Sequence, residues 1–362
     1  MNQVNHFAAD SRSALQAREH AQWIAFAPSI FQAARVLCVS GIVAEVERSA
    51  AAGVTLEEVA GRVALPLYGV RVLMEAGLGL GLLLEREGRY TSTKTAWFLL
   101  HDALTRANMD FTHDVTYRGM FELEASVRSG RPAGLRTLGD WPTIYQGLAH
   151  LPEQVRASWL AFDHYHSDAA FPAALPLVFR RPSRRLLDIG GNTGRWALAC
   201  VRHDAAVQVT VLDLPGQLEM ARTQIHQDAE AARIFFVEGN LLDAQQELPR
   251  GHDAIWMSQF LDCFSEQQIV SILERCQRAL ADDGRIYILE PFWDRQRFAT
   301  AAFCLQQTTL YFTALANGNS QMYRSSTFLP LVAAAGLDVE EQHDGLGVHT
   351  LLVCRRQAGA GT

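Results

Sequence analysis

The first hundred residues place apolar side chains at helical spacing. Between residues 24 and 49 they recur every three or four positions, which predicts a helix. Thr55 and Glu58 match the pattern of a reciprocal helix cap, and a further apolar helix follows Pro66. Two short apolar runs flank residues 86–88 and predict a small hairpin. Helices followed by a hairpin outline a winged helix, so we expect a mainly α N-terminal domain.

The pattern changes in the second half of the chain. Residues 101–180 are predicted to form a mostly helical bridge, and the polar, proline-containing residues 180–183 indicate a boundary. From residue 184 onward, predicted strands alternate with helices, which indicates a parallel, doubly wound sheet. The predicted strands are Arg185–Ile189, Val207–Leu212, Ile234–Val237, Ala254–Ser258 and Arg285–Leu289. After Gly336, two extended runs, Leu337–Glu341 and His349–Cys354, predict an antiparallel hairpin that closes the sheet edge.

Composition and charge then narrow the function. A chain of 362 residues that is 49% hydrophobic and 20% charged fits a two-domain globular protein. Its net charge of -7 argues against binding of nucleic acid. In the helix after Pro66, Arg71 is the only basic residue that could contact phosphate, and the acidic Glu75 offsets its charge. We therefore favour packing or dimerisation for that helix. Lys94 is the single lysine, and there is no phosphate-binding GxxxxGK[ST] loop.

The expected compartment is the cytoplasm. The six cysteines show neither a CxxC pair nor metal-ligand spacing with histidine, so no metal site is predicted and the thiols suit a reducing compartment. Residues 1–18 are polar and lack the apolar segment of a secretory signal. No apolar run approaches the roughly 20 residues of a membrane span, so no membrane contact is expected.

A glycine-rich turn carries the candidate chemistry. The first predicted strand ends at Asp188, and Gly190, Gly191 and Gly194 lead into a helix that should begin near residue 193. Glycines there let a ligand lie against the backbone at the carboxyl edge of the sheet. Asp188 would repel a diphosphate but attract a cationic ligand, and Asp213, at the end of the second strand, can accept ribose hydroxyls. The alternative is an ordinary turn in which Asp188 caps the helix.

Four segments resemble one enzyme family in order and spacing. They read LLDIGGNTGRWALA, VTVLDLPGQLEMAR, FFVEGNLLD and DAIWMSQFLDCFSEQQIVSILERCQRALADDGRIYILEP. They are similar to the motifs of S-adenosylmethionine-dependent O-methyltransferases of the class I, two-domain type, which have an N-terminal winged-helix dimerisation domain. The resemblance implies a homodimer, S-adenosylmethionine as cofactor and a Rossmann-like catalytic domain. The expected domains are residues 1–105 for dimerisation, 106–180 for a helical bridge that contributes to the substrate pocket, and 181–362 for catalysis.

The same resemblance assigns the cofactor contacts. Gly190 to Gly194 would lie under the methionyl part, Asp213 would hold the ribose and Leu214 would pack on the adenine. Further implied contacts come from the pairs Gly239 with Asn240 and Ser258 with Gln259. Asn240 stands where the family usually has aspartate, so its side-chain oxygen would meet the adenine amine; the alternative is a turn residue.

The expected base departs from the family pattern. Asp262, Cys263 and Phe264 stand where the family has His-Asp-Trp. A phenol with a pKa of about 10 needs help to ionise, and an aspartate is a weak base unless burial raises its pKa. Three alternatives stay open: Asp262 is the base, His164 or His166 replaces it, or positioning alone suffices. Glu290 would support the base, or else be a solvated loop carboxylate.

Acceptor contacts are expected from aromatic and methionine side chains: His166, Phe264, Phe303, Tyr311 and Met322. The predicted reaction is methyl transfer from S-adenosylmethionine to a hydroxyl of an aromatic or polyketide-like small molecule. Two other hypotheses remain. One is a ligand-sensing, winged-helix DNA-binding regulator, and the other is a cofactor-binding protein of the same fold whose chemistry has drifted away from methyl transfer.

Overall fold

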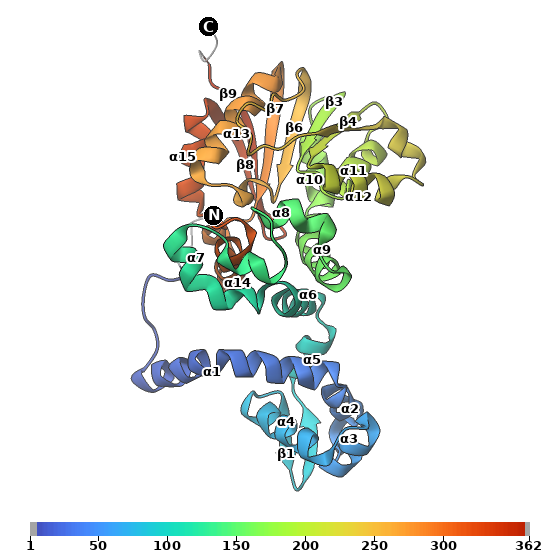
Figure 1. Ribbon diagram of the computed structural model, residues 1–362, viewed down its shortest axis with the longest axis vertical. Helices are drawn as coiled ribbons and strands as arrows, with labels where there is room; N and C mark the ends of the chain where they lie inside the picture. Colours follow the sequence, from blue (N-terminus) through green and yellow to red (C-terminus); the bar gives the residue numbers. More distant parts are fainter. Residues whose placement is uncertain (1–5, 359–362) are drawn as a thin grey trace. The chain divides into compact units, whose positions relative to one another are not determined.

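A computed structural model describes residues 6–358 of the chain. Residues 1–5 of the polar N-terminal stretch and residues 359–362 of the predicted catalytic domain lie outside the described residues. The described chain forms two compact units: one comprises residues 7–110, and the other comprises residues 111–358 together with His6 (Figure 1).

The first unit is mainly helical, as predicted. Gly41, with φ 81°, separates α1 from α2, so the apolar periodicity over residues 24–49 belongs to two helices and not to one. Thr55 and Glu58 cap α3 reciprocally, and the predicted hairpin is present as β1 and β2. The elements are α1 (Ala14–Val39), α2 (Ile42–Arg48), α3 (Leu56–Val63), α4 (Leu67–Gly79), β1 (Leu83–Arg86), β2 (Arg89–Ser92), α5 (Lys94–His101) and the start of α6 (Ala103–Phe111).

Helix α1 presents much of its apolar surface to solvent. Leu37 is its only fully buried residue, whereas Trp23, Ile24 and Phe26 are each about half exposed or more. By length and composition α1 is also long and apolar enough to cross a membrane, contrary to the expectation from the sequence. One such helix near an N-terminus is weak evidence for a span, because helices of other kinds pass the same test.

The second unit is built on a seven-stranded sheet in the order β5-β4-β3-β6-β7-β9-β8. Five strands are parallel, and β9 enters antiparallel between β7 and β8. The hairpin predicted after Gly336 is therefore present, but its antiparallel strand lies inside the sheet and β8 forms the edge. The strands are β3 (Arg185–Ile189), β4 (Gln208–Asp213), β5 (Ile234–Glu238), β6 (His252–Ser258), β7 (Leu280–Glu290), β8 (Leu337–Leu346) and β9 (His349–Arg356).

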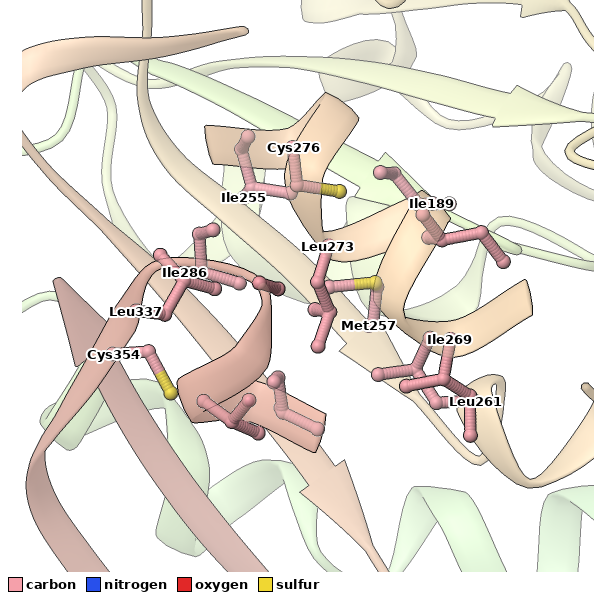
Figure 2. Close-up of a cluster of buried hydrophobic side chains, with 14 of the residues drawn as sticks. Ile189, Ile255, Met257, Leu261, Ile269, Leu273, Cys276, Ile286, Leu337 and Cys354 are labelled. Carbon is pink, nitrogen blue, oxygen red and sulfur yellow. The ribbon is translucent and has the colours of Figure 1, made fainter. Parts of the chain in front are cut away.

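Helices cover both faces of this sheet, because alternate strand residues point to opposite sides. Leu187, Ile189 and Met257 pack with residues of α13 and α15, while Leu186, Trp256 and Tyr287 belong to the cluster on the other face. Figure 2 shows Ile269, Leu273 and Cys276 of α13 packed over the first of these faces. The covering helices are α10 (Phe171–Val178), α11 (Arg195–His203), α12 (Pro215–Ile225), α13 (Glu266–Ala279) and α15 (Ser325–Ala334).

A third group of helices forms its own apolar cluster with the segment after β7. Phe111, Ile144 and Leu148 pack there against Tyr311 and Phe312. The helices are α7 (Leu123–Ser129), α8 (Ile144–Gly147), α9 (Glu153–Asp168) and α14 (Ala299–Tyr311). Residues 111–180 of the predicted helical bridge thus lie in the same compact unit as the sheet, whereas residues 101–110 belong to the first unit.

The packing of α13 gives a stability prediction. Leu273 is completely buried between α13 and the sheet, so Leu273→Ala should lower the free energy of unfolding by about 2–5 kcal/mol. The measurement is urea unfolding followed by circular dichroism. Glu274→Ala is the matched control, because the neighbouring Glu274 is exposed on the same helix. Equal unfolding midpoints for the two variants would contradict this account of the core.

Candidate active site

The glycine-rich turn lies where the strand order reverses, between β3 and β6. Gly190 has φ 72°, and a Cβ on it would stand 2.2 Å from the Phe260 ring. A Cβ on Gly191 would stand 2.6 Å from Oδ2 of Asp188. Gly194, with φ 76°, precedes α11, which begins at Arg195, two residues later than predicted. Side chains at positions 190 and 191 would therefore collide with Phe260 and Asp188, so the turn needs glycine at both.

Two carboxylates stand at the ends of neighbouring strands beside this turn. Asp188 is buried, and its Oδ2 has no hydrogen-bond partner among the described residues. Burial, and then the charge of Asp213, raise the pKa of Asp188 to about 8. Asp213 accepts hydrogen bonds from the backbone N–H of Asn192 (2.9 Å) and Leu214 (2.7 Å), and burial raises its pKa to about 6. Two desolvated carboxylates side by side attract a cationic or hydroxyl-rich ligand.

A third carboxylate, which the sequence analysis did not single out, comes from α9. Asp163 accepts hydrogen bonds from Nδ2 of Asn192 (3.0 Å) and Nε2 of Gln259 (3.4 Å), and burial raises its pKa to about 6. Gln259 in turn accepts from Nε2 of His349 (2.6 Å). The only sequence signal was the position of Asp163 directly before His164.

The glycine-rich turn, Asp188 and Asp213 line one cavity. The remaining predicted cofactor residues line this cavity as well, apart from Gly194. Leu214, Gly239, Asn240, Ser258 and Gln259 all border it. The hydroxyl of Ser258 is buried and has no partner within the described chain, so it is available to a ligand. Oδ1 of Asn240 accepts from the backbone N–H of Leu242 (3.1 Å), so this residue does form the turn considered as its alternative role.

The other half of the cavity is aromatic. The rings of Phe111 and Phe162 stack with centroids 4.2 Å apart, and Tyr311 meets Phe111 edge-on at 5.1 Å. Nε1 of Trp159 donates a hydrogen bond to Oη of Tyr311 (2.8 Å), which fixes both rings. Phe264, Tyr311 and Met322, three predicted acceptor contacts, line this half.

Asp262 lies on the short turn Leu261–Cys263 between β6 and α13. Ser265 and Gln268 cap α13 reciprocally, so Asp262 is not used as a cap. Its side chain lines the cavity and is buried, and Sγ of Cys263 approaches Oδ1 at 3.4 Å. Burial raises the pKa of Asp262 to about 7, into the range in which a carboxylate can exchange protons near neutrality.

Glu290 holds the turn that carries Asp262. Its Oε1 accepts hydrogen bonds from the backbone N–H groups of Phe260 (3.0 Å) and Leu261 (2.8 Å). Glu290 is only 2% exposed, so the alternative of a solvated loop carboxylate is wrong. Burial and the nearby charge of Asp262 raise its pKa well above the usual range.

The two candidate histidines differ in position. His164 lines the cavity, shares a hydrogen bond with Oγ1 of Thr193 (2.9 Å), and has a pKa lowered to about 4 by burial. His166 is not among the lining residues; it packs edge-on against Phe162 with ring centroids 4.9 Å apart. His166 lies on the same side of α9 as Phe162 and Asp163, so helix spacing alone does not explain why it is outside the lining.

Phe303 also lies outside the cavity lining, contrary to its predicted acceptor role, and is 54% exposed. The lining residues of this segment are Thr308, Tyr311 and Phe312, three and four positions apart on α14 and its continuation. Phe303 shares its exposed side with Gln307, one turn further along.

Among residues 6–358, no three His, Cys, Asp or Glu side chains are grouped so that they could hold a metal ion.

The buried carboxylates predict a pH-dependent stability. A folded-state pKa of about 8 for Asp188, against about 3.9 when unfolded, means that the unfolded chain binds fewer protons between these values, so stability is lost as pH rises to 8. The lowered pKa values of His164, His166 and His349 act oppositely, but only up to about pH 6.5. The melting temperature of the free protein should fall from pH 6.5 to 8, and Asp188→Asn should flatten this fall. Parallel curves for the two proteins in a thermal scan would contradict it.

Known protein families match both units of the chain. The sequence model of the O-methyltransferase domain matches residues 153–338, and that of the Dimerisation2-like domain matches residues 18–90. The L-tyrosine C(3)-methyltransferase of Streptomyces lavendulae is 22% identical over 322 residues, covering 88% of this chain and 86% of that protein. The 3-hydroxy-5-methyl-1-naphthoate 3-O-methyltransferase of Streptomyces sahachiroi is 28% identical over 247 residues, covering 67% and 69%.

The fold is shared with solved structures as well. The S-adenosylmethionine-dependent methyltransferase SibL, in its apo form, superposes with a TM-score of 0.70 at 25% identity, covering 94% of this chain and 99% of that one. The resemblance seen in the sequence motifs and the predicted fold class are thus confirmed. The chain belongs to the O-methyltransferase domain family, whose cofactor is S-adenosylmethionine, and it carries a Dimerisation2-like domain before the catalytic one.

Proposed function

We propose that this chain transfers a methyl group from S-adenosylmethionine to a hydroxyl of an aromatic or polyketide-like small molecule, with Asp262 as the base. The observation that carries the proposal is the position of one buried carboxylate, Asp262, in a cavity that joins the glycine-rich turn to an aromatic chamber. The test is incubation of the protein with the cofactor and a panel of aromatic hydroxy compounds, followed by mass spectrometry for the gain of one methylene unit. No gain on any compound would overturn the proposal.

The residues of the cofactor half suit a sulfonium nucleoside. Asp213 would hold the ribose hydroxyls, and the glycine-rich turn would accommodate the methionyl part. The partnerless Oδ2 of Asp188 and hydroxyl of Ser258 offer buried polar atoms that a ligand would satisfy. Leu214 and Asn240 would border the adenine. When bound, the cofactor supplies an electrophilic methyl group.

Asp262 is better suited than His164 to take the hydroxyl proton. The pKa of the Asp262 carboxyl is raised to about 7, whereas the pKa of the His164 imidazole is lowered to about 4. The group with the higher pKa is the stronger base. His164 is also engaged with Thr193 on the cofactor side. Glu290 acts as a positioning residue, because it binds the backbone N–H groups just before Asp262.

A second candidate reaction is methylation of a ring carbon beside the hydroxyl. A phenolate carries negative charge on its oxygen and on the adjacent ring carbons, so the same base serves both reactions. The relative from Streptomyces lavendulae, similar over 88% of this chain, is named as a C-methyltransferase of tyrosine. NMR of the methylated product distinguishes the two reactions, because an O-methyl and a C-methyl group resonate at different carbon shifts. A drifted, non-methyl chemistry would instead yield no methylated product.

The assembly is proposed to be a cytoplasmic homodimer formed through the unit of residues 7–110. Support comes from the match to a Dimerisation2-like domain and from the exposed apolar side chains of α1. All six cysteines are free thiols, which suits a reducing compartment. Helix α4, the candidate DNA-reading helix, carries Arg71 as its one basic residue, so nucleic-acid binding is not proposed. Light scattering during size-exclusion chromatography tests the dimer, and a monomer mass would contradict it.

A further inference from the structure

The charges that line the cavity are almost all negative. Five carboxylates border it: Asp163, Asp168, Asp188, Asp213 and Asp262. Arg195 is the one arginine or lysine among the described lining residues, and it lies at the exposed rim, where it is paired with Asp168. Inside the cavity there is therefore no cationic side chain to bind a carboxylate of an acceptor.

Asp262 and Asp163 both lie near Tyr311 at the aromatic end, where the charge of Asp163 adds to burial in raising the pKa of Asp262. The one hydrogen bond of the Asp262 side chain within the described chain is the weak one from Sγ of Cys263 to Oδ1, so Oδ2 is left to a ligand. The surrounding walls are the rings of Phe111, Trp159 and Tyr311. Aromatic faces attract cations, and a desolvated carboxylate beside them adds a charge partner.

The strength of the base leads to the same class of acceptor. A carboxyl with a pKa of about 7 is a weak base toward a simple phenol, whose pKa is about 10. A positively charged nitrogen on the acceptor lowers the pKa of its hydroxyl, since the phenolate is then stabilised by a nearby opposite charge. The hydroxyl of such an acceptor ionises more readily, and the same positive charge attracts the ionised carboxylate of Asp262.

We propose that the acceptor is a hydroxylated aromatic base, that is, a ring that carries a hydroxyl and a nitrogen positively charged at neutral pH, and that it carries no carboxylate. Asp262 then has two roles: it selects the cationic acceptor and it accepts the proton of the hydroxyl. This inference rests on the proposed function and adds the charge of the substrate to it.

The test uses three phenols of matched size that differ in one substituent: meta-hydroxybenzylamine, meta-cresol and meta-hydroxybenzoate. Their dissociation constants are measured by calorimetry with the full-length protein saturated with S-adenosylhomocysteine. The amine should bind about tenfold more tightly than the cresol, the size of one charge-assisted hydrogen bond, and the benzoate most weakly. The proposal is overturned if the benzoate binds as tightly as the amine.

Two variants locate the effect. Asp262→Asn should abolish the preference for the amine over the cresol, because it removes the charge but keeps the shape. Glu266→Gln is the matched control: Glu266 is an exposed carboxylate at the start of α13, outside the cavity lining, and its removal should leave the preference intact. An unchanged preference in Asp262→Asn would overturn the proposal. Equal methylation of the benzoate and the amine would leave the methyltransferase function standing and refute only this inference.

Discussion

Replacing Asp262 by asparagine should lower kcat at neutral pH by a factor of about 10² to 10⁴, the usual contribution of a general base. The amide keeps the shape of the side chain but cannot take the proton of the acceptor hydroxyl. The dissociation constant of S-adenosylhomocysteine should stay unchanged, because Asp262 lies at the aromatic end of the cavity. Initial rates at saturating acceptor, together with calorimetry for the cofactor product, measure the two effects separately.

The pH dependence of the rate sharpens this test. In the parent enzyme kcat should rise with pH through about 7, as the carboxyl of Asp262 loses its proton, and this rise should vanish in Asp262→Asn. His164→Ala is the comparison variant, and it should retain the rise. Full turnover in Asp262→Asn with intact cofactor affinity would show that Asp262 is not the base, and loss of the rise in His164→Ala would assign that role to the histidine.

Replacing Asp213 by alanine should weaken binding of S-adenosylhomocysteine by about 100-fold. The variant loses the acceptor for the ribose hydroxyls and also leaves the N–H groups of Asn192 and Leu214 without their carboxylate partner. Two hydrogen bonds to a charged group, each contributing about 1.5 kcal/mol, account for this factor. Isothermal titration calorimetry gives the dissociation constants directly.

The matched control for this change is Glu238→Ala. Glu238 pairs with Asp213 in the register of β4 and β5 and is likewise a carboxylate at a strand end, but it does not line the cavity. Its removal should leave cofactor affinity within a factor of about two, as expected for an exposed side chain outside the cavity lining. An equal loss in both variants would mean that the effect of Asp213 is a general one of charge or stability.

The sequence predicted best those features that depend on one strand end or one turn. Asp188 and Asp213 could be placed together because consecutive parallel strands bring their carboxyl ends to one edge. The capping box at Thr55 was likewise a local pattern with a local cause. For such residues, the separation along the chain already fixes the separation in space.

Contacts between distant segments were the part that the sequence did not reveal. Asp163 reaches the glycine-rich turn from α9, and His349 reaches Gln259 from β9, across 90 positions of the chain. Phe303 was misplaced because a helix with apolar residues on most sides does not indicate which side faces the cavity. These positions are set by how helices dock on the sheet, which periodicity alone does not determine.

The place of β9 in the sheet has a consequence for synthesis on the ribosome. Residues 349–356 are the last strand to be translated among those described, yet they insert between β7 and β8, which are made earlier. Until then the edge of β7 has no neighbour on that side, and an unpaired, apolar strand edge promotes aggregation. Nascent chains that stall before residue 349 should therefore depend on chaperones to protect this edge. The helical unit of residues 7–110 should not, because it is fully translated by then.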